Sequence, residues 1–173
     1  MALAQGGAGF LAFEDKGAVM EPVFYLENDE NDFLLMQVGF RKIGCRNFVR
    51  WFERSSDLKA ALDKCAGGEI PRLVLADLKL NGEYGLETIE WLTAQERYKA
   101  VASFIISSGQ IGREIIATLE KRASGYVFKP SSLEGWIELA RQFKTIAEPE
   151  DCRDSSRECM SAGSVEGAAK VSF

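Results

Sequence analysis

Apolar residues follow two alternating patterns along the chain. Short continuous apolar runs, typical of strands buried on both faces, are separated by longer segments in which apolar residues recur every three or four positions, as on one face of a helix. The runs predict strands at 23–26, 48–52, 73–76, 102–106 and 125–128, and the longer segments predict helices at 33–43, 57–65, 86–92, 115–123 and 136–143. This alternation indicates a doubly wound α/β fold, in which helices cover both faces of a parallel sheet.

Polar residues in front of the helices suggest how each helix begins. Asn31 or Asp32 is expected to cap the first helix. Ser55 or Ser56 is expected to cap the second, and the segment 131–134 has the capping-box pattern of a Ser followed three positions later by a Glu. These side chains would bind backbone N–H groups that the first helical turn leaves without partners.

The two ends of the chain lack both patterns. Residues 1–21 are rich in Gly and Ala, and residues 146–173 are rich in Ser, Gly, Ala and charged residues without a sustained period. Segments of this kind bury too little apolar surface to fold on their own. We therefore expect a flexible N-terminal extension, one domain at 22–145 and a disordered C-terminal tail.

Composition and charge narrow the classes of function. The net charge of -5, without a visible basic cluster, gives no general attraction to nucleic acid or to an anionic membrane. No apolar run approaches the roughly 20 residues that a membrane-spanning helix needs, and the N-terminus lacks the basic start of a signal peptide. We expect a cytoplasmic protein without nucleic-acid or membrane partners.

Cysteine and histidine usage removes several kinds of site. The chain contains no histidine, and its cysteines, Cys45, Cys65, Cys152 and Cys159, show no C-x-x-C spacing. A zinc site and a disulfide framework are therefore disfavoured. Catalysis by Ser-His-Asp or Cys-His groups is excluded, because both need an imidazole.

Reactive side chains stand at the ends of four predicted strands. Glu27 and Asn28 follow the first strand, Asp77 the third, Ser107 the fourth and Lys129 the fifth. Each of them alone is ordinarily a turn, cap or loop residue. Because the carboxyl ends of parallel strands meet at one edge of the sheet, where α/β proteins bind their ligands, together they predict one crevice that holds acids, an amide, a hydroxyl and an ammonium.

The spacing of these residues resembles that of the receiver domain of two-component response regulators, over residues 22–145. Asp77 and Ser107 are thirty positions apart, Ser107 and Lys129 twenty-two, and the segment 123–130, Ala-Ser-Gly-Tyr-Val-Phe-Lys-Pro, is the most specific match. The resemblance implies a flavodoxin-like (βα)5 fold with strand order 2-1-3-4-5. That order places the strand at 48–52 at an edge, which suits its charged residue Arg50.

The resemblance also implies phosphorylation of an aspartate. A carboxylate can act as the nucleophile that forms an aspartyl phosphate, and Asp77 stands at the phosphoacceptor position. Mg²⁺ prefers hard oxygen ligands in near-octahedral geometry. The positions that match its ligands are Glu27, Asn28, Asp77 and the backbone carbonyl of Lys79.

Three more positions match the family's neutralising and switching residues. Lys129 would neutralise charge on the phosphoryl oxygens, a task suited to a cation on a long stem. Ser107 would donate its hydroxyl to a phosphoryl oxygen, and Tyr126 corresponds to the aromatic residue that turns inward with it. The resemblance implies at most self-catalysed phosphotransfer and autodephosphorylation as enzymatic activity.

Asn28 departs from the family pattern, which has a second acid in contact with the metal. An amide oxygen can coordinate Mg²⁺ but adds no charge, so we expect weaker binding than in a receiver with two acids. Asp29 is the adjacent acid that would compensate in part. The alternative function is a degenerate receiver that serves as a phosphorylation-independent protein-interaction module.

Other phosphate-handling folds fit the chain less well. A haloacid-dehalogenase-type phosphatase needs a second Asp two positions after its nucleophile, where this chain has Lys79. A dinucleotide-binding fold needs a Gly-rich turn after the first strand, and a flavodoxin needs a phosphate loop there. The chain instead has the acidic segment 27–32, which would repel a phosphate.

The resemblance implies protein partners on both sides of the signal. A sensor histidine kinase or a phosphotransfer protein would supply the phosphoryl group to a stand-alone response regulator, and the chain resembles those of the phytochrome-kinase-partner type. The signal would leave through the fourth helix, fifth strand and fifth helix, at about 112–143, toward a downstream protein or a second copy of the chain. The sequence names neither the kinase nor the output.

Overall fold

The structure is a computed structural model that describes residues 22–45, 49–65, 70–109 and 122–147. Its elements are β1 (Val23–Leu26), α1 (Glu30–Lys42), β2 (Val49–Phe52), α2 (Ser55–Lys64), β3 (Leu73–Asp77), α3 (Gly85–Thr93), the short 3-10 helix η2 (Glu96–Tyr98), β4 (Ala102–Ser107), β5 (Gly125–Phe128) and α5 (Leu133–Ala147). No helix among the described residues is both long and apolar enough to cross a bilayer. The helix expected at 115–123 lies largely outside the described residues.

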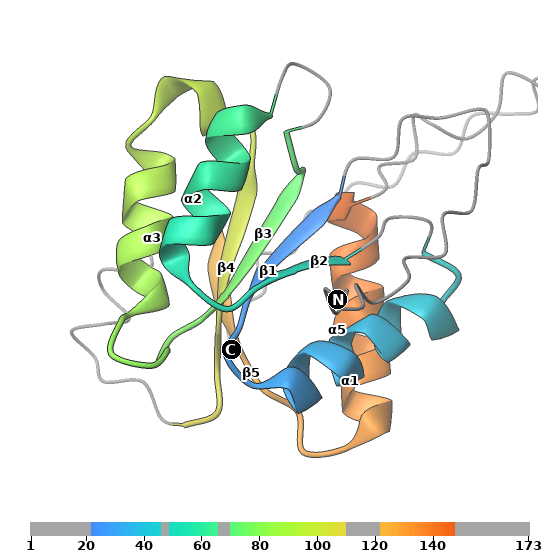
Figure 1. The fold of residues 1–173 in the computed structure, drawn as a ribbon. Coiled ribbons are helices and arrows are strands. Elements are labelled where there is room, and N and C mark those ends of the chain that lie inside the picture. Colours follow the sequence, from blue (N-terminus) through green and yellow to red (C-terminus); the bar gives the residue numbers. More distant parts are fainter. Residues whose placement is uncertain (1–21, 46–48, 66–69, 110–121, 148–173) are drawn as a thin grey trace, which may run out of the picture.

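The five strands form one parallel sheet in the order β2-β1-β3-β4-β5. The fold class and the strand order expected from the sequence are therefore confirmed. Helices α2 and α3 cover one face of the sheet, and α1 and α5 cover the other (Figure 1). Strand β2 lies at an edge of this sheet, where the charged Arg50 is exposed, as its composition predicted.

Each face of the sheet buries its own apolar core. Alternate residues of a strand point to opposite faces, so Phe24 and Leu26 pack toward α2 and α3 whereas Val23 and Tyr25 pack toward α1 and α5. All residues of β1 and β3 are buried, because helices cover both faces of the sheet and each of these strands has a strand on either side. This double burial is why their sequences read as continuous apolar runs.

Helices α1 and α5 pack closely against each other on the same face of the sheet. A Cβ atom added to Gly39 of α1 would lie 2.7 Å from the carbonyl oxygen of Trp136 and 3.0 Å from the Cβ of Ala140, both in α5. Only a glycine at this position lets the two backbones approach so closely. The Nζ of Lys144, near the end of α5, donates to the carbonyl of Ile43 at 3.0 Å and ties the two helices again.

The helix starts differ from those expected. Asp29, and not Asn31 or Asp32, caps α1: its Oδ1 accepts from the Asn31 N–H at 2.8 Å. Helix α2 begins after Arg54 without a side-chain cap.

The two ends of α5 also differ in detail from the sequence prediction. The Ser132 hydroxyl accepts from the Gly135 N–H at 3.2 Å, so the cap is one residue later than the capping-box pattern indicated. The helix continues to Ala147, two residues past the expected domain boundary at 145, and Ala147 is only 3% exposed. The expected extension at 1–21 and the tail beyond 147 lie outside the described residues.

Candidate functional site

The register of the sheet brings the strand-end residues to one edge. Leu26 is paired with Ala76, so Glu27 and Asp77 come next on neighbouring strands. Lys129 follows β5, and its N–H donates to the carbonyl of Ser107 at 2.8 Å. The ends of β1, β3, β4 and β5 therefore converge as the sequence predicted.

The ammonium of Lys129 lies among three carboxylates. Its Nζ is 2.8 Å from Glu27 Oε2, 2.7 Å from Asp32 Oδ2 and 2.8 Å from Asp77 Oδ2. An ammonium has three N–H donors, and each of them finds an acceptor here. The Lys129 side chain is 8% exposed, so this ion cluster is largely shielded from water. We call these four residues the acid pocket.

Glu27 is held rigidly at the back of the acid pocket. It is 0% exposed, its Oε1 accepts from the Asp29 N–H at 3.0 Å, and its Oε2 accepts from the Tyr25 hydroxyl at 2.9 Å. Burial and the neighbouring Glu27 carboxylate raise the pKa of Tyr25 well above its usual value, so Tyr25 remains a donor. Sequence reasoning missed Tyr25, because an aromatic residue in a buried strand is ordinarily only packing.

The pKa values of Lys129 and Glu27 show how the charges are shared. Burial by itself lowers the pKa of Lys129, but the hydrogen bonds to Asp32, Asp77 and Glu27 together raise it above its usual value of 10.5. Burial raises the pKa of Glu27, and the attraction of Lys129 offsets this only in part. The two directions differ in cause: Lys129 is stabilised as a cation by three acids, whereas for Glu27 the desolvation caused by burial exceeds the attraction of an ammonium shared with Asp32 and Asp77.

Asp77 ends β3 with its two oxygens engaged differently. Oδ1 accepts from the backbone N–H of Lys79 at 3.1 Å, and Oδ2 contacts Lys129. The chain then turns back so closely that a Cβ on Gly85 would lie 2.0 Å from the Asp77 carbonyl oxygen. A glycine at the start of α3 is therefore required to keep the β3 end in place.

Asn28 offers an oxygen with no partner. Its Oδ1 is buried and accepts no hydrogen bond from the described residues, while its Nδ2 donates to Asn81 Oδ1 at 3.4 Å. A buried carbonyl oxygen without a donor is costly unless a cation or water approaches it. Together with the carboxylates of Glu27 and Asp77, the Asn28 oxygen belongs to the class of hard oxygen ligands that Mg²⁺ prefers. Among the described residues, no three His, Cys, Asp or Glu side chains are arranged as a ready metal cage.

The side chains of Ser107 and Tyr126 have their contacts outside the acid pocket. The Ser107 hydroxyl donates to the Gly109 carbonyl at 3.3 Å and accepts from the Gly109 N–H at 3.4 Å, so it is engaged in its own turn. Tyr126 is half-buried, and its ring meets that of Phe128 edge-on at 6.1 Å. In this structure neither side chain is part of the acid pocket formed around Lys129.

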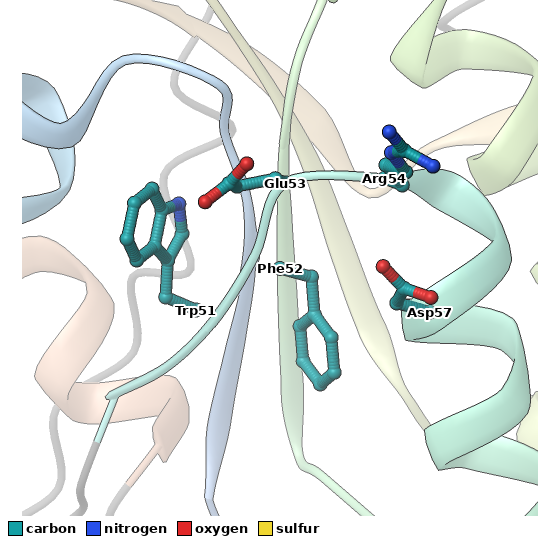
Figure 2. Close-up of a pocket in the computed structure, with 5 residues that line it drawn as sticks. All are labelled: Trp51, Phe52, Glu53, Arg54 and Asp57. Carbon is teal, nitrogen blue, oxygen red and sulfur yellow. The ribbon is translucent and has the colours of Figure 1, made fainter. Parts of the chain in front are cut away.

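A hollow of about 410 Å³ adjoins the acid pocket at the end of β2 and the start of α2. Figure 2 shows its lining residues, Trp51, Phe52, Glu53, Arg54 and Asp57, with Trp51 pointing away from Arg54 and Asp57. The Trp51 indole N–H donates to the Glu27 carbonyl at 2.6 Å, and its ring stacks on that of Phe33 at 5.0 Å. The hollow is therefore a neighbour of the acid pocket and not the place where the reactive groups meet.

Solved structures share this architecture. The phosphorylated cyanobacterial phytochrome response regulator RcpA superposes with a TM-score of 0.63 and 17% identity, covering 72% of this chain and 91% of its own. The response regulator RPA3017 in red light signalling of R. palustris superposes with a TM-score of 0.61 and 16% identity over 72% of this chain and 92% of its own. The fold is that of a response-regulator receiver domain.

Sequence comparison adds one curated relative of this receiver-like chain. The probable methanogenesis regulatory protein FilR2 of Methanothrix harundinacea is 26% identical over 144 residues, which covers 78% of this chain and 89% of that protein. No family model matches the chain. The Mn²⁺-bound form of the response regulator Rcp1 is another structural neighbour, with a TM-score of 0.61 and 17% identity over 72% of this chain and 92% of its own.

The receiver fold gathers most of the site residues that the sequence singled out. Lys129 contacts both Glu27 and Asp77, and Asn28 follows Glu27 in the chain. Asp29 was expected to compensate for Asn28, but its carboxylate is exposed and caps α1. Asp32 was expected to be a cap and instead contacts Lys129. Asp29 is therefore the helix cap, and Asp32 is the acid that reaches Lys129.

Proposed function

We propose that the chain is a cytoplasmic response regulator that accepts a phosphoryl group on Asp77. The observation that carries this proposal is the contact of 2.8 Å between Lys129 Nζ and Asp77 Oδ2 in a shielded pocket at the carboxyl edge of a receiver-type sheet. A sensor histidine kinase or a phosphotransfer protein would be the donor. The fold supports a response regulator as the class of protein. The acid pocket contains the carboxylate and the ammonium that phosphoryl transfer would use.

The transfer needs positioning and charge neutralisation more than covalent assistance. An Asp77 oxygen attacks the phosphorus, the bond from phosphorus to the donor's imidazole nitrogen breaks, and the imidazole leaves with the electron pair. Lys129 is placed to bind a phosphoryl oxygen as charge accumulates there. The Lys79 N–H, at 3.1 Å from Asp77 Oδ1, orients the nucleophile.

The charge of the acid pocket calls for a divalent cation. Three carboxylates face one ammonium, which leaves an excess of two negative charges that would repel an incoming phosphate. The residues that would hold Mg²⁺ are Glu27, Asn28, Asp77 and the carbonyl of Lys79. When bound, Mg²⁺ would supply positive charge that offsets the acids and the phosphoryl oxygens.

The readout of phosphorylation would begin at Ser107. Its hydroxyl must leave Gly109 to reach a phosphoryl oxygen, and Tyr126 would move inward with it. Part of the expected output surface at 112–143 lies outside the described residues, and the remainder includes β5, whose Phe128 is exposed. A downstream protein or a second copy of the chain would bind there.

Incubation with acetyl phosphate and Mg²⁺, followed by intact mass spectrometry, tests the proposal. We expect the mass to rise by one phosphoryl group in the wild type and not in Asp77→Ala. Lys129→Met should slow the gain, because an acid pocket without its ammonium repels the phosphate more strongly. The Glu138→Gln variant, changed on the exposed face of α5, is the matched control and should react like the wild type.

Absence of any gain in the wild type would favour the second candidate, a phosphorylation-independent interaction module. The observation that favours this candidate is Asn28, a neutral residue at a position where the resemblance implies an acid. In that case the acid pocket would serve only to hold the strand ends together.

A further inference from the structure

Asp32 lies in the first turn of α1 but does not cap the helix. It comes three residues after the Asp29 cap, so its carboxylate is not needed to satisfy the start of the helix. Its Oδ2 instead reaches Lys129 Nζ at 2.7 Å, across 97 positions of sequence. The side chain is 24% exposed, compared with 0% for Glu27, and so it forms the outer wall of the acid pocket.

Three contacts fix the position of Lys129, and Asp32 supplies one of them. With Glu27 and Asp77 alone, the ammonium would have two acceptors on adjacent strand ends and one N–H without a protein partner. Asp32 approaches from a different element, α1, and therefore holds the ammonium from another direction. The positive end of the α1 dipole favours an anion in this first turn.

Asp32 also restores negative charge that Asn28 does not provide. Asn28 presents a buried oxygen without a partner among the described residues but no charge, whereas Asp32 brings a carboxylate from α1 to the ammonium that also contacts Glu27, the residue before Asn28. A divalent cation near the Asn28 oxygen would be attracted by the excess of negative charge to which Asp32 contributes. The charge that a second acid at the strand end would supply comes instead from the first turn of α1.

We propose that Asp32 is a positioning residue of the acid pocket, which holds the Lys129 ammonium beside Asp77 and provides the acidic charge that Asn28 lacks for binding a divalent cation. This inference rests on the proposed function and deepens it. Asp32 acts on the reacting groups through Lys129 and through charge.

The test compares acid-to-amide changes at neighbouring positions of the full chain. Asp32→Asn removes the charge inside the acid pocket, and Glu30→Gln removes a charge from the exposed side of the same helix turn. Mg²⁺ affinity is measured by titration calorimetry, and phosphoryl uptake from acetyl phosphate by intact mass. We expect Asp32→Asn to weaken Mg²⁺ binding about 10-fold, as found for groups that orient metal ligands, and Glu30→Gln to change it less than about twofold.

A charge exchange separates a positioning role from a general loss of structure. In the double variant Asn28→Asp with Asp32→Asn, the acid returns to the strand end, and we expect most of the Mg²⁺ affinity to be recovered. Thermal melting followed by circular dichroism shows whether each variant is folded. If Asp32→Asn is unfolded, the double variant decides the matter: recovered fold and affinity support the inference, and unrecovered affinity in a folded protein overturns it.

The outcomes for Asp32 and for the proposed function are distinct. Equal Mg²⁺ affinity and equal uptake rate in Asp32→Asn and Glu30→Gln would overturn the role of Asp32, even if Asp77 is phosphorylated. No uptake by the wild type would overturn the proposed function, and the calorimetric comparison alone would then decide whether Asp32 supplies charge to a cation site.

Discussion

At the scale of single residues, the acid pocket depends on how one positive charge is divided. Lys129 interacts with all three acids, whereas Glu27 competes with Asp32 and Asp77 for the same ammonium. Glu27 is also the most deeply buried of the three, so it carries the largest desolvation cost. Burial therefore disfavours the ionised form of Glu27 and raises its pKa.

Stability should depend on pH through Glu27. Burial raises its pKa above the usual value of 4.5, so the folded chain binds this proton more tightly than the unfolded chain. The contribution of Glu27 to the free energy of unfolding is then fully present below pH 4.5 and is lost as the pH rises through the raised pKa. Urea unfolding at a series of pH values, for the wild type and Glu27→Gln, measures this contribution as the difference between them.

We expect the free energy of unfolding of the wild type, relative to that of Glu27→Gln, to fall as the pH increases from about 4.5, because glutamine has no proton to lose. Other titrating groups are common to both chains and largely cancel. A difference that stays constant, or that moves in favour of the wild type with rising pH, would contradict the raised pKa.

Residue-level prediction succeeded where chemistry and strand position agree. Glu27 and Lys129 directly follow strands of the sheet and Asp77 is the last residue of one, and the parallel sheet alone brings such positions together. Asp29 and Asp32 belong to a run of acids and amides that are all good caps, so local preference does not choose among them. The choice depends on where β1 ends and on the distant Lys129, which no local pattern encodes.

At the scale of elements, the strands were easier to predict than the helix ends. Burial on both faces leaves a continuous apolar run, and the predicted bounds of β1 and β5 agree with the observed ones. Helix starts depend on single hydrogen bonds, such as that of Asp29 with Asn31 in α1. Close packing between elements, as at Gly39, leaves no periodic signal at all.

The α1–α5 contact gives a test at this scale. We expect Gly39→Ala to lower the free energy of unfolding by about 1–3 kcal/mol, because the added Cβ collides with the α5 backbone. Arg41→Ala, an exposed change in the same helix, should alter it by less than about 0.5 kcal/mol. Urea unfolding monitored by circular dichroism measures both. Stabilisation by Gly39→Ala, the usual effect of replacing an exposed helical glycine, would show that the helices are not so close.

At the scale of the whole molecule, the sequence predicted the layers and the strand order, and helix α5 continues two residues past the expected domain boundary at 145. The strand order follows from alternating elements and from the family resemblance, and both are properties of long segments. The boundary depends on the last turn of α5, where Ile146 packs against the core and Ala147 belongs to it. Because the composition changes gradually beyond 145, the sequence gives no clear signal for where the last turn of α5 ends.

Truncation tests the boundary. A chain that ends after Ala147 should be more stable than one that ends after Thr145, by about 1–3 kcal/mol, because the shorter chain loses buried apolar surface and the final helical turn. Thermal and urea unfolding of the two chains measure the difference. Equal stabilities would mean that the domain ends at 145 after all.

The contact between Trp51 and the end of β1 gives the molecule an optical reporter of its own. The indole donates to the Glu27 carbonyl and stacks on Phe33, one residue after Asp32, so its surroundings are linked to both acids. Trp136 is buried between α1 and α5, and Trp91 lies beside Tyr98 on the opposite side of the sheet. Emission from Trp51 is therefore the part of the intrinsic fluorescence that registers events at the carboxyl edge, without any attached dye.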